Sequence, residues 1–164
     1  MAAQPNQKRD KMNKQQRSNL AKTAIFLIEE AKDEHFDMRQ YLITTEHSRI
    51  EYPAEVCTSY NECGTTCCFA GHGPMALRSK MVIGEKWNEY NKRVFGVAQD
   101  ESLWTFLFDS DWVNSRKQAA SRALIFLEKG VPEIFFEYQS RYLTPLSNKK
   151  LVERLQAFVI TRKR

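Results

Sequence analysis

The sequence predicts a mainly α-helical, compact single-domain protein of 164 residues, with about six to seven helices. Apolar residues recur at spacings of three and four along most of the chain, which places them on one face of successive helices. The chain length suits one domain with a single hydrophobic core. Residues typical of strands are sparse, and the β-like stretch at 41–45 is too short to build a sheet alone. We therefore expect at most a short hairpin, near residues 41–62.

The first helix is predicted to begin at about Lys14. Its apolar stripe has helical spacing and consists of Leu20, Ala24, Leu27, Ile28 and Ala31. The preceding residues, 1–13, are polar and basic, and we expect a disordered tail. Residues 32–62 are the least regular part of the chain, and Pro53 disfavours a helix there.

Glycine and proline residues divide the middle of the chain into short helices. A helix is expected over residues 74–81, with its proline at the first position. The next helix lies between Gly84 and Gly96. Asp100 is the expected N-cap of a short and very apolar helix over residues 103–108. The aromatic residues of that helix are more typical of a core than of a nucleic-acid stacking platform, because no basic residue lies among them.

The clearest helical pattern of the sequence follows Asn114, which we expect to be its N-cap. The helix is predicted to end at Gly130, because a proline follows two residues later. A further helix is expected to begin at Pro132. A terminal helix is expected over residues 151–159, where apolar residues again share one face.

Positive charge is concentrated at the two ends of the chain. Residues 1–22 hold six basic residues and one acidic residue, and residues 149–164 hold the same numbers, whereas the middle holds 13 basic and 18 acidic residues. The helical domain is expected over 14–160, with a basic end at 161–164. Such ends can contact nucleic-acid phosphates or simply keep a protein in solution. The candidate nucleic-acid contacts are Lys8, Arg9, Lys11, Lys14, Arg17, Arg162, Lys163 and Arg164.

All four cysteines lie between residues 57 and 68. Because bridges among them would close very short loops, we interpret them as reduced thiols of a cytoplasmic protein. Ordinary buried thiols are the first interpretation. A nucleophilic thiol with His35, His47 or His72 as its base is the second. Zinc is the third, although the spacing C-x5-C-x3-C-C-x3-H matches no common zinc module, and no other cofactor is expected. The candidate zinc ligands are Cys57, Cys63, Cys67, Cys68 and His72.

The segment that contains these cysteines is also rich in glycine and alanine. Its glycines do not form a phosphate-binding loop, because the pattern lacks the lysine and the preceding strand of such a motif. We predict instead that Gly71 allows two helices to pack closely. The segment is therefore interpreted as structural first and as a functional site second.

Several short motifs follow one another in order along residues 36–130. They are Phe36-Asp37-Met38, Cys63-Gly64-Thr65 with Cys67 and Ala70-Gly71, Gly96-Val97, Leu107-Phe108 before Trp112, and a helix that ends at Gly130. This succession resembles a group of small phage, prophage and bacterial proteins of unknown function. In that group F-D-M precedes C-G-T-x-x-C-x-A-G and a short apolar L-F element.

The resemblance implies a phage genome and action in the cytoplasm of the infected cell, and it carries over no catalytic residue. The residues assigned to the motif are Cys63, Gly64, Thr65, Cys67, Ala70 and Gly71, with the second cysteine doubled. Cys57, Cys68 and His72 are left outside the motif, which weakens the zinc interpretation.

Three hypotheses for function follow. The first is a non-enzymatic accessory protein that binds a host or defence protein, with an acidic body and apolar aromatic residues docking on a basic partner surface. The second is a nucleic-acid-binding module that uses the basic ends. The third is a cysteine- or zinc-dependent enzyme. No apolar run approaches the roughly 20 residues of a membrane span and no signal-peptide core is present, so we expect a cytoplasmic protein without membrane contact.

Overall fold

A computed structural model describes residues 12–38, 51–55, 68–78, 81–98, 102–108, 115–132 and 146–161. Within these ranges the chain forms six α-helices and three short 3-10 helices, with no β-strand, which confirms the helical fold class. The expected hairpin near residues 41–62 falls mostly outside the described ranges, where only the 3-10 helix η3 (Pro53–Glu55) is described. No helix in the described part of the chain is long and apolar enough to cross a membrane.

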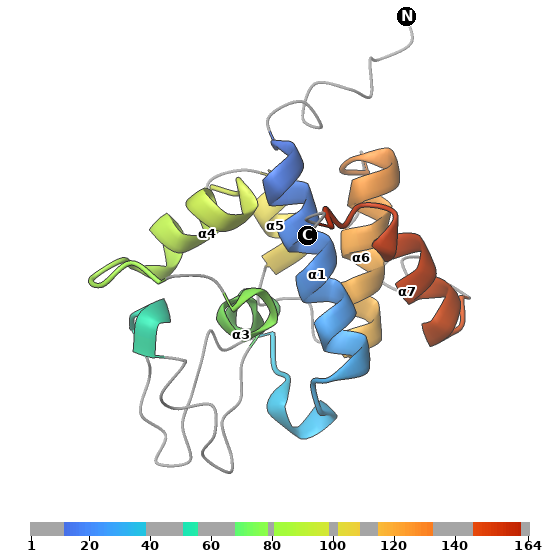
Figure 1. The fold of residues 1–164 in the computed structure, drawn as a ribbon, viewed down its shortest axis with the longest axis horizontal. Helices are drawn as coiled ribbons and strands as arrows, with labels where there is room; N and C mark the ends of the chain where they lie inside the picture. Colours follow the sequence, from blue (N-terminus) through green and yellow to red (C-terminus); the bar gives the residue numbers. More distant parts are fainter. Residues whose placement is uncertain are drawn as a thin grey trace, which may run out of the picture.

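Two long antiparallel helices, α1 (Lys14–Glu29) and α6 (Arg116–Lys129), form the centre of the fold (Figure 1). An arginine in the first turn of each helix donates a hydrogen bond to a backbone carbonyl near the C-terminal end of the other helix. Arg17 of α1 donates a hydrogen bond to the carbonyl of Leu127 at 2.6 Å, and Arg116 of α6 donates to the carbonyl of Leu27 at 2.6 Å. The last carbonyls of a helix have no partner within it, so each arginine satisfies one of them and places positive charge at the negative end of the helix dipole.

Helix α1 begins at Lys14, as the sequence predicted. Asn13 is the N-cap, and its side chain accepts a hydrogen bond from the backbone N–H of Gln16 at 2.9 Å. The Gln16 side chain in turn accepts from the Asn13 N–H, which completes a capping box. Met12 is buried. Met12 and Asn13 therefore belong to the folded domain and not to the tail over residues 1–13 that the sequence predicted.

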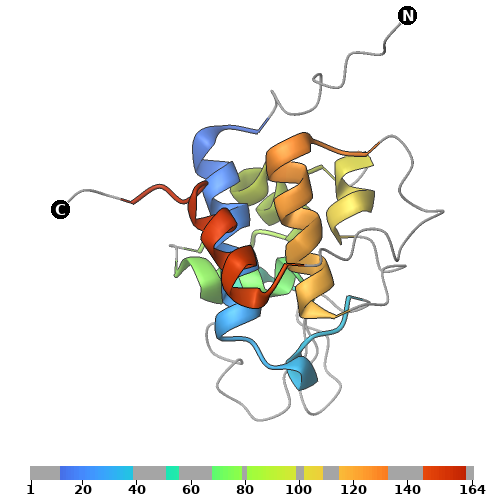
Figure 2. The same cartoon turned by 90° about the vertical axis from the view of Figure 1, so that its right-hand side faces the viewer.

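The terminal helix α7 (Asn148–Gln156) packs against α1 and α6 (Figure 2). Ser147 caps it through a hydrogen bond from the Lys150 N–H, and Leu151 and Leu155 are its buried residues. Both leucines belong to the stripe that the sequence predicted. A groove between the end of α1 and the start of α7 is lined by Ile28, Glu29, Asn148, Lys149, Val152 and Glu153.

The short helices α3 (Gly73–Leu77), α4 (Trp87–Phe95) and α5 (Ser102–Phe108) cover the other side of α1 (Figure 1). Glycine ends α4 as predicted, because Gly96 takes a φ of 68° that disfavours other residues. The prediction for α3 is wrong in length. Its proline lies in the first turn, but the helix ends at Leu77 and not near residue 81, since Arg78 adopts the left-handed conformation.

The ends of α6 give one correct and one incorrect prediction. Gly130 ends the helix with a φ of 87°, as the sequence indicates. The N-cap is Ser115, whose side chain accepts from the Gln118 N–H, and not Asn114, which lies outside the described residues. The Gln118 side chain accepts from the Ser115 N–H at 2.8 Å, so this helix also begins with a capping box.

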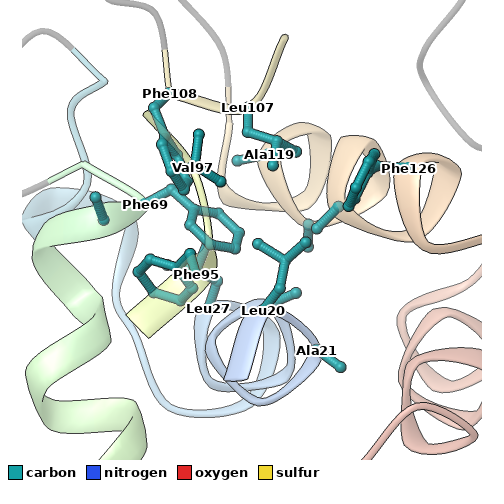
Figure 3. Close-up of a cluster of buried hydrophobic side chains, with 14 of the residues drawn as sticks. Leu20, Ala21, Leu27, Phe69, Phe95, Val97, Leu107, Phe108, Ala119 and Phe126 are labelled. Carbon is teal, nitrogen blue, oxygen red and sulfur yellow. The ribbon is translucent and has the colours of Figure 1, made fainter. Parts of the chain in front are cut away.

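The hydrophobic core lies between α1, α6 and the short helices. Phe69 is near its centre and contacts Phe95 and Phe108, with ring centroids 6.3 and 5.7 Å apart. Figure 3 shows these rings between Leu20 and Leu27 of α1 and the α6 side chains. The aromatic residues of α5 are thus core residues, as predicted. The described residues lining the core in Figure 3 include Leu20, Ala21, Leu27, Phe69, Phe95, Val97, Leu107, Phe108, Ala119 and Phe126.

Candidate functional site

The cysteine-rich motif is described from Cys68 onwards. Cys57, Cys63, Gly64, Thr65 and Cys67 lie outside the described residues, so their predicted roles stay predictions. The assignment of the second cysteine of the motif to Cys67 is wrong. Counting along C-G-T-x-x-C-x-A-G from Cys63, the second cysteine falls on Cys68 and not on Cys67. Cys68 thus belongs to the pattern, followed by Ala70 and Gly71.

The described part of the motif forms the 3-10 helix η4 (Ala70–His72), which continues into α3. Cys68, Ala70 and Gly71 are buried. The backbone N–H of His72 donates to the carbonyls of Cys68 and Phe69, each at 3.2 Å, which closes the turn. This part of the motif therefore lies in the core, as a structural role requires.

His72 is fully buried beside this turn. Its Nδ1 lies 2.8 Å from the Cys68 carbonyl oxygen and donates a hydrogen bond to it. The ring packs between Phe26 and Phe36, with centroid distances of 6.1 and 5.9 Å. Burial is the main reason why the pKa of His72 is lowered to about 4, and the charges of His35 and Arg116 contribute to that value. His72 is therefore neutral at pH 7 and acts as a core residue whose Nδ1 is bonded to the Cys68 carbonyl.

The Cys68 thiol is equally withdrawn from solvent. Burial is the main reason why the pKa of this thiol is raised to about 11, and the charge of Asp37 makes a smaller contribution to that value. A nucleophilic cysteine requires the opposite shift, toward the thiolate. Cys68 is therefore a thiol at pH 7, and the nucleophilic interpretation, which concerns Cys63 or Cys67, stays a prediction because both residues lie outside the described ranges.

The described residues hold no group of three or more histidine, cysteine, aspartate or glutamate side chains that could bind a metal ion. His72 and Cys68 both come from the predicted zinc ligand set. The other three candidate ligands lie outside the described residues.

Motifs far apart in the sequence meet in this part of the core. Phe36 of the F-D-M motif packs on His72, and Met38 is buried. Phe69, within the cysteine motif, packs on Phe108 of the L-F element, and Val97 is also buried. Side chains from these separate segments thus pack together in the described structure.

Gly73 is the residue of this region against which neighbouring side chains pack most closely in the described structure. A Cβ atom at this position would lie 2.6 Å from the Tyr90 Oη and 3.0 Å from the Phe95 Cζ. Both rings are fully buried, so neither can move away cheaply. The sequence predicted such a close approach at Gly71, which is buried two residues earlier.

The Gly73→Ala variant is expected to lower the free energy of unfolding by about 2 kcal/mol, because the added methyl group overpacks the core. Helix propensity alone would favour alanine by up to about 1 kcal/mol, so the sign of the change identifies the steric effect. Urea unfolding followed by circular dichroism measures it. Ala76→Ser, which adds one heavy atom at a half-buried position of the same helix, is the control. A Gly73→Ala protein as stable as the wild type would contradict the predicted clash.

The basic candidates do not share one role. Lys14 is exposed at the start of α1. Arg17 is not a free nucleic-acid contact as the sequence suggested, because its guanidinium binds the Leu127 carbonyl and lies over the Phe158 ring, 5.4 Å from the ring centroid. The other candidates, Lys8, Arg9, Lys11, Arg162, Lys163 and Arg164, lie outside the described residues.

A tight turn before α4 carries an exposed aliphatic pair that sequence reasoning missed. The Ile83 side chain is 95% exposed and Val82 is 49% exposed. Gly84 follows with a φ of 80°, and the Glu85 N–H donates to the Val82 carbonyl at 3.3 Å. The available signal was an apolar run, Met81 to Ile83, directly before a glycine and between charged residues.

An ion pair holds this turn against α4. The Glu85 carboxylate is buried, and it accepts two hydrogen bonds from the Arg93 guanidinium at 2.6 and 2.7 Å. The Lys86 N–H donates to the Glu89 carboxylate at 2.9 Å, which fixes the first turn of the helix. The Val82–Ile83 pair is therefore presented on a fixed support.

Comparison of the chain with protein-family models, with curated proteins and with solved structures found no match.

Proposed function

We propose that this protein is a non-enzymatic accessory protein that binds another protein through the turn at Val82 and Ile83. The observation that carries the proposal is the 95% exposure of Ile83 at the tip of a fixed turn. Burying one such side chain contributes about 1.5–3 kcal/mol to association. The resemblance to phage proteins supports a host or defence protein of the infected cell as the partner.

The exposed residues that support this proposal differ from those expected. The described aromatic residues are buried or half-buried, so the docking surface proposed here is not built from them. The exposed large apolar residues in the described part of the chain are Val82, Ile83 and Ile160. A docking turn made of aliphatic residues replaces the aromatic surface of the original hypothesis.

The turn is prepared for binding before the partner arrives. Its backbone is closed by the Glu85–Val82 hydrogen bond, and the Glu85–Arg93 ion pair ties it to α4. Ordering a loop on binding costs free energy, so a turn that is already ordered keeps more of the gain from burying Ile83.

The charges around the turn define the partner's chemistry. Glu85 is neutralised by Arg93, whereas Arg78 and Lys86 are exposed on either side of the turn in the sequence. The partner surface that fits is an apolar pocket with acidic residues at its rim. This differs from the basic partner surface that the acidic composition of the chain body suggested.

The Ile83→Asp variant is expected to weaken binding to the partner by at least about 30-fold, since it removes a central apolar contact and places a charge in an apolar pocket. Its melting temperature should equal that of the wild type, because the side chain is almost fully exposed. The measurement is affinity capture from infected-cell extract with the wild type as bait. The captured protein is then purified and titrated against the wild type and against Ile83→Asp.

Gln156→Asp is the matched control, because it adds the same charge at an exposed position of α7. A photo-crosslinking residue placed at position 83 should link to the captured protein, and the same residue at position 156 should not. Capture that is equally strong with Ile83→Asp, or crosslinking from position 156 alone, would show that the turn is not the docking site.

A further inference from the structure

A groove lies on the opposite side of the molecule from the turn at Val82 and Ile83. It runs between the end of α1 and the start of α7, and its volume is about 410 Å³. The turn directly precedes α4, and in Figure 1 α4 lies to the left of α1 whereas α7 lies to its right. The turn therefore does not reach the groove of its own molecule, but it is free to approach the groove of another.

The groove has an apolar floor and a charged rim. Ile28 of α1 and Val152 of α7 line it and are half-buried. The charged residues of the lining, Glu29, Lys149 and Glu153, are exposed, so the rim has two negative charges and one positive charge. Ligand pockets in proteins typically have volumes of roughly 300–1,000 Å³, so this groove is large enough to take an aliphatic side chain and its neighbour.

The turn has the complementary features. Its tip is the 95% exposed side chain of Ile83. The exposed residues Arg78 and Lys86 flank the turn in the sequence, and the exposed Glu89 follows in the first turn of α4. The turn thus presents an apolar tip with two positive charges and one negative charge, the reverse of the charges on the groove rim. The partner chemistry derived above for this turn, an apolar pocket with acidic residues at its rim, occurs on this chain itself.

Ile160 is the other strongly apolar side chain that is exposed outside the turn in the described part of the chain. Its backbone N–H donates a hydrogen bond to the Ser18 hydroxyl at 2.9 Å, which holds it beside the first half of α1. Its side chain is 41% exposed and projects less far into solvent than that of Ile83. The turn is therefore the better fitted of the two to enter a groove on another molecule.

We infer that the turn of one copy of this chain docks in the groove between α1 and α7 of a second copy. The inference rests on the docking role proposed for the turn, and it adds a second copy of the chain as a partner. Because the two surfaces differ and lie on opposite sides, the contact is head-to-tail and produces chains or a ring rather than a two-fold dimer. An occupied turn cannot present Ile83 to another protein, so self-association competes with binding of the host or defence protein.

The test is sedimentation equilibrium of the purified full-length protein up to about 1 mM, because so small an interface is weak. The wild type should form dimers and larger species as the concentration rises. Ile83→Asp and Val152→Asp should each weaken association at least about tenfold, since each places a charge in the apolar contact. Ile160→Asp, which makes the same change at the other exposed isoleucine, is the matched control and should associate like the wild type. Melting temperatures show whether each variant is folded.

Mixing the two variants tests the head-to-tail arrangement. Ile83→Asp keeps an intact groove, and Val152→Asp keeps an intact turn. Their mixture should form a one-to-one heterodimer with an affinity within about twofold of the wild-type contact, and no larger species, because one intact contact is all that the pair can make. If Val152→Asp does not fold, the double variant Glu29→Lys with Glu153→Lys takes its place, since it reverses the charge of the exposed rim and leaves the floor unchanged.

Three results would overturn the inference: a wild-type protein that stays monomeric, association that neither variant weakens, or a mixture that forms no heterodimer. Capture of the host or defence protein separates this inference from the proposed function. Val152→Asp should capture that protein at least as well as the wild type, because its turn is intact. Capture that depends on Ile83 together with a monomeric wild type would contradict only the self-association. Self-association as described together with capture that does not depend on Ile83 would contradict only the proposed function.

Discussion

Lowering the pH from 7 to 4 is expected to lower the free energy of unfolding by about 3 kcal/mol through His72 alone. The pKa of His72 is about 4 in the folded protein and about 6.5 in an unfolded chain, chiefly because the ring is fully buried. Between these two values the unfolded chain binds a proton that the folded protein does not bind. The contribution of His72 to the free energy of unfolding is therefore fully present above about pH 6.5, and it decreases as the pH falls toward 4.

Urea unfolding at a series of pH values, compared between wild type and His72→Asn, isolates this contribution. Asparagine places an amide nitrogen where the His72 Nδ1 donates to the Cys68 carbonyl, but it does not titrate. The variant should be less stable at pH 7, because it packs less well against Phe26 and Phe36, and the difference from wild type should shrink as the pH falls. His35→Gln removes a smaller cause of the lowered His72 pKa, so it should reduce the pH dependence only slightly, because burial is the largest cause. Parallel curves for wild type and His72→Asn would contradict the buried, neutral state of His72.

The sequence predicted those parts of the fold that local chemistry determines. The ends of α4 and α6 follow from Gly96 and Gly130, since both adopt a positive φ that other residues avoid. The stripe of α1 and the pair Leu151 and Leu155 follow from helical spacing, because an amphipathic helix must bury its apolar face.

Local sequence patterns did not predict the end of a helix where a capping side chain or an unusual backbone conformation determines it. Asn114 and Ser115 are both good N-cap residues, and the capping box with Gln118 selects the serine. Arg78 ends α3 in a left-handed conformation that a sequence pattern does not indicate for arginine. Met12 is buried although its neighbours in sequence are polar, because tertiary packing places it against the core.

The sequence predicted which residues belong to the cysteine-rich candidate site, but not the contacts between them. Small residues and cysteines marked the segment around Cys68, and their burial agrees with a core role for its described part. The contacts that define the site come from distant segments, such as Phe36 on His72 and Ile160 on Ser18. Spacing along one chain does not report such pairs, and without them Arg17 resembled the other basic residues near the start of the chain.

Replacing Arg116 by alanine is expected to lower the free energy of unfolding by about 3 kcal/mol, because it leaves the carbonyl end of α1 without a donor. The Arg116 Nη1 donates to the carbonyls of Leu27 and Ala31, and its Nε donates to the Asp33 carboxylate at 2.7 Å. The Ala31 N–H bonds to the Phe26 carbonyl, so it does not continue the α-helical pattern to Leu27. No basic residue of α1 itself lies in its last turn, and Arg116 supplies the positive charge that the helix dipole favours there.

Two further variants separate the possible causes of this loss. Arg116→Lys keeps the positive charge but not the planar group that reaches two carbonyls and a carboxylate, so it should recover only part of the lost stability. Asp33→Asn removes the ion pair alone, and its effect should be small because the Asp33 side chain is 83% exposed. Urea unfolding at pH 7 measures the change in the free energy of unfolding for Arg116→Ala, Arg116→Lys and Asp33→Asn. If Asp33→Asn were as damaging as Arg116→Ala, the ion pair and not the capping of α1 would be the source of stability. If Arg116→Ala unfolded like the wild type, the antiparallel pair of α1 and α6 would not depend on this arginine, and its counterpart Arg17 would be the next residue to test.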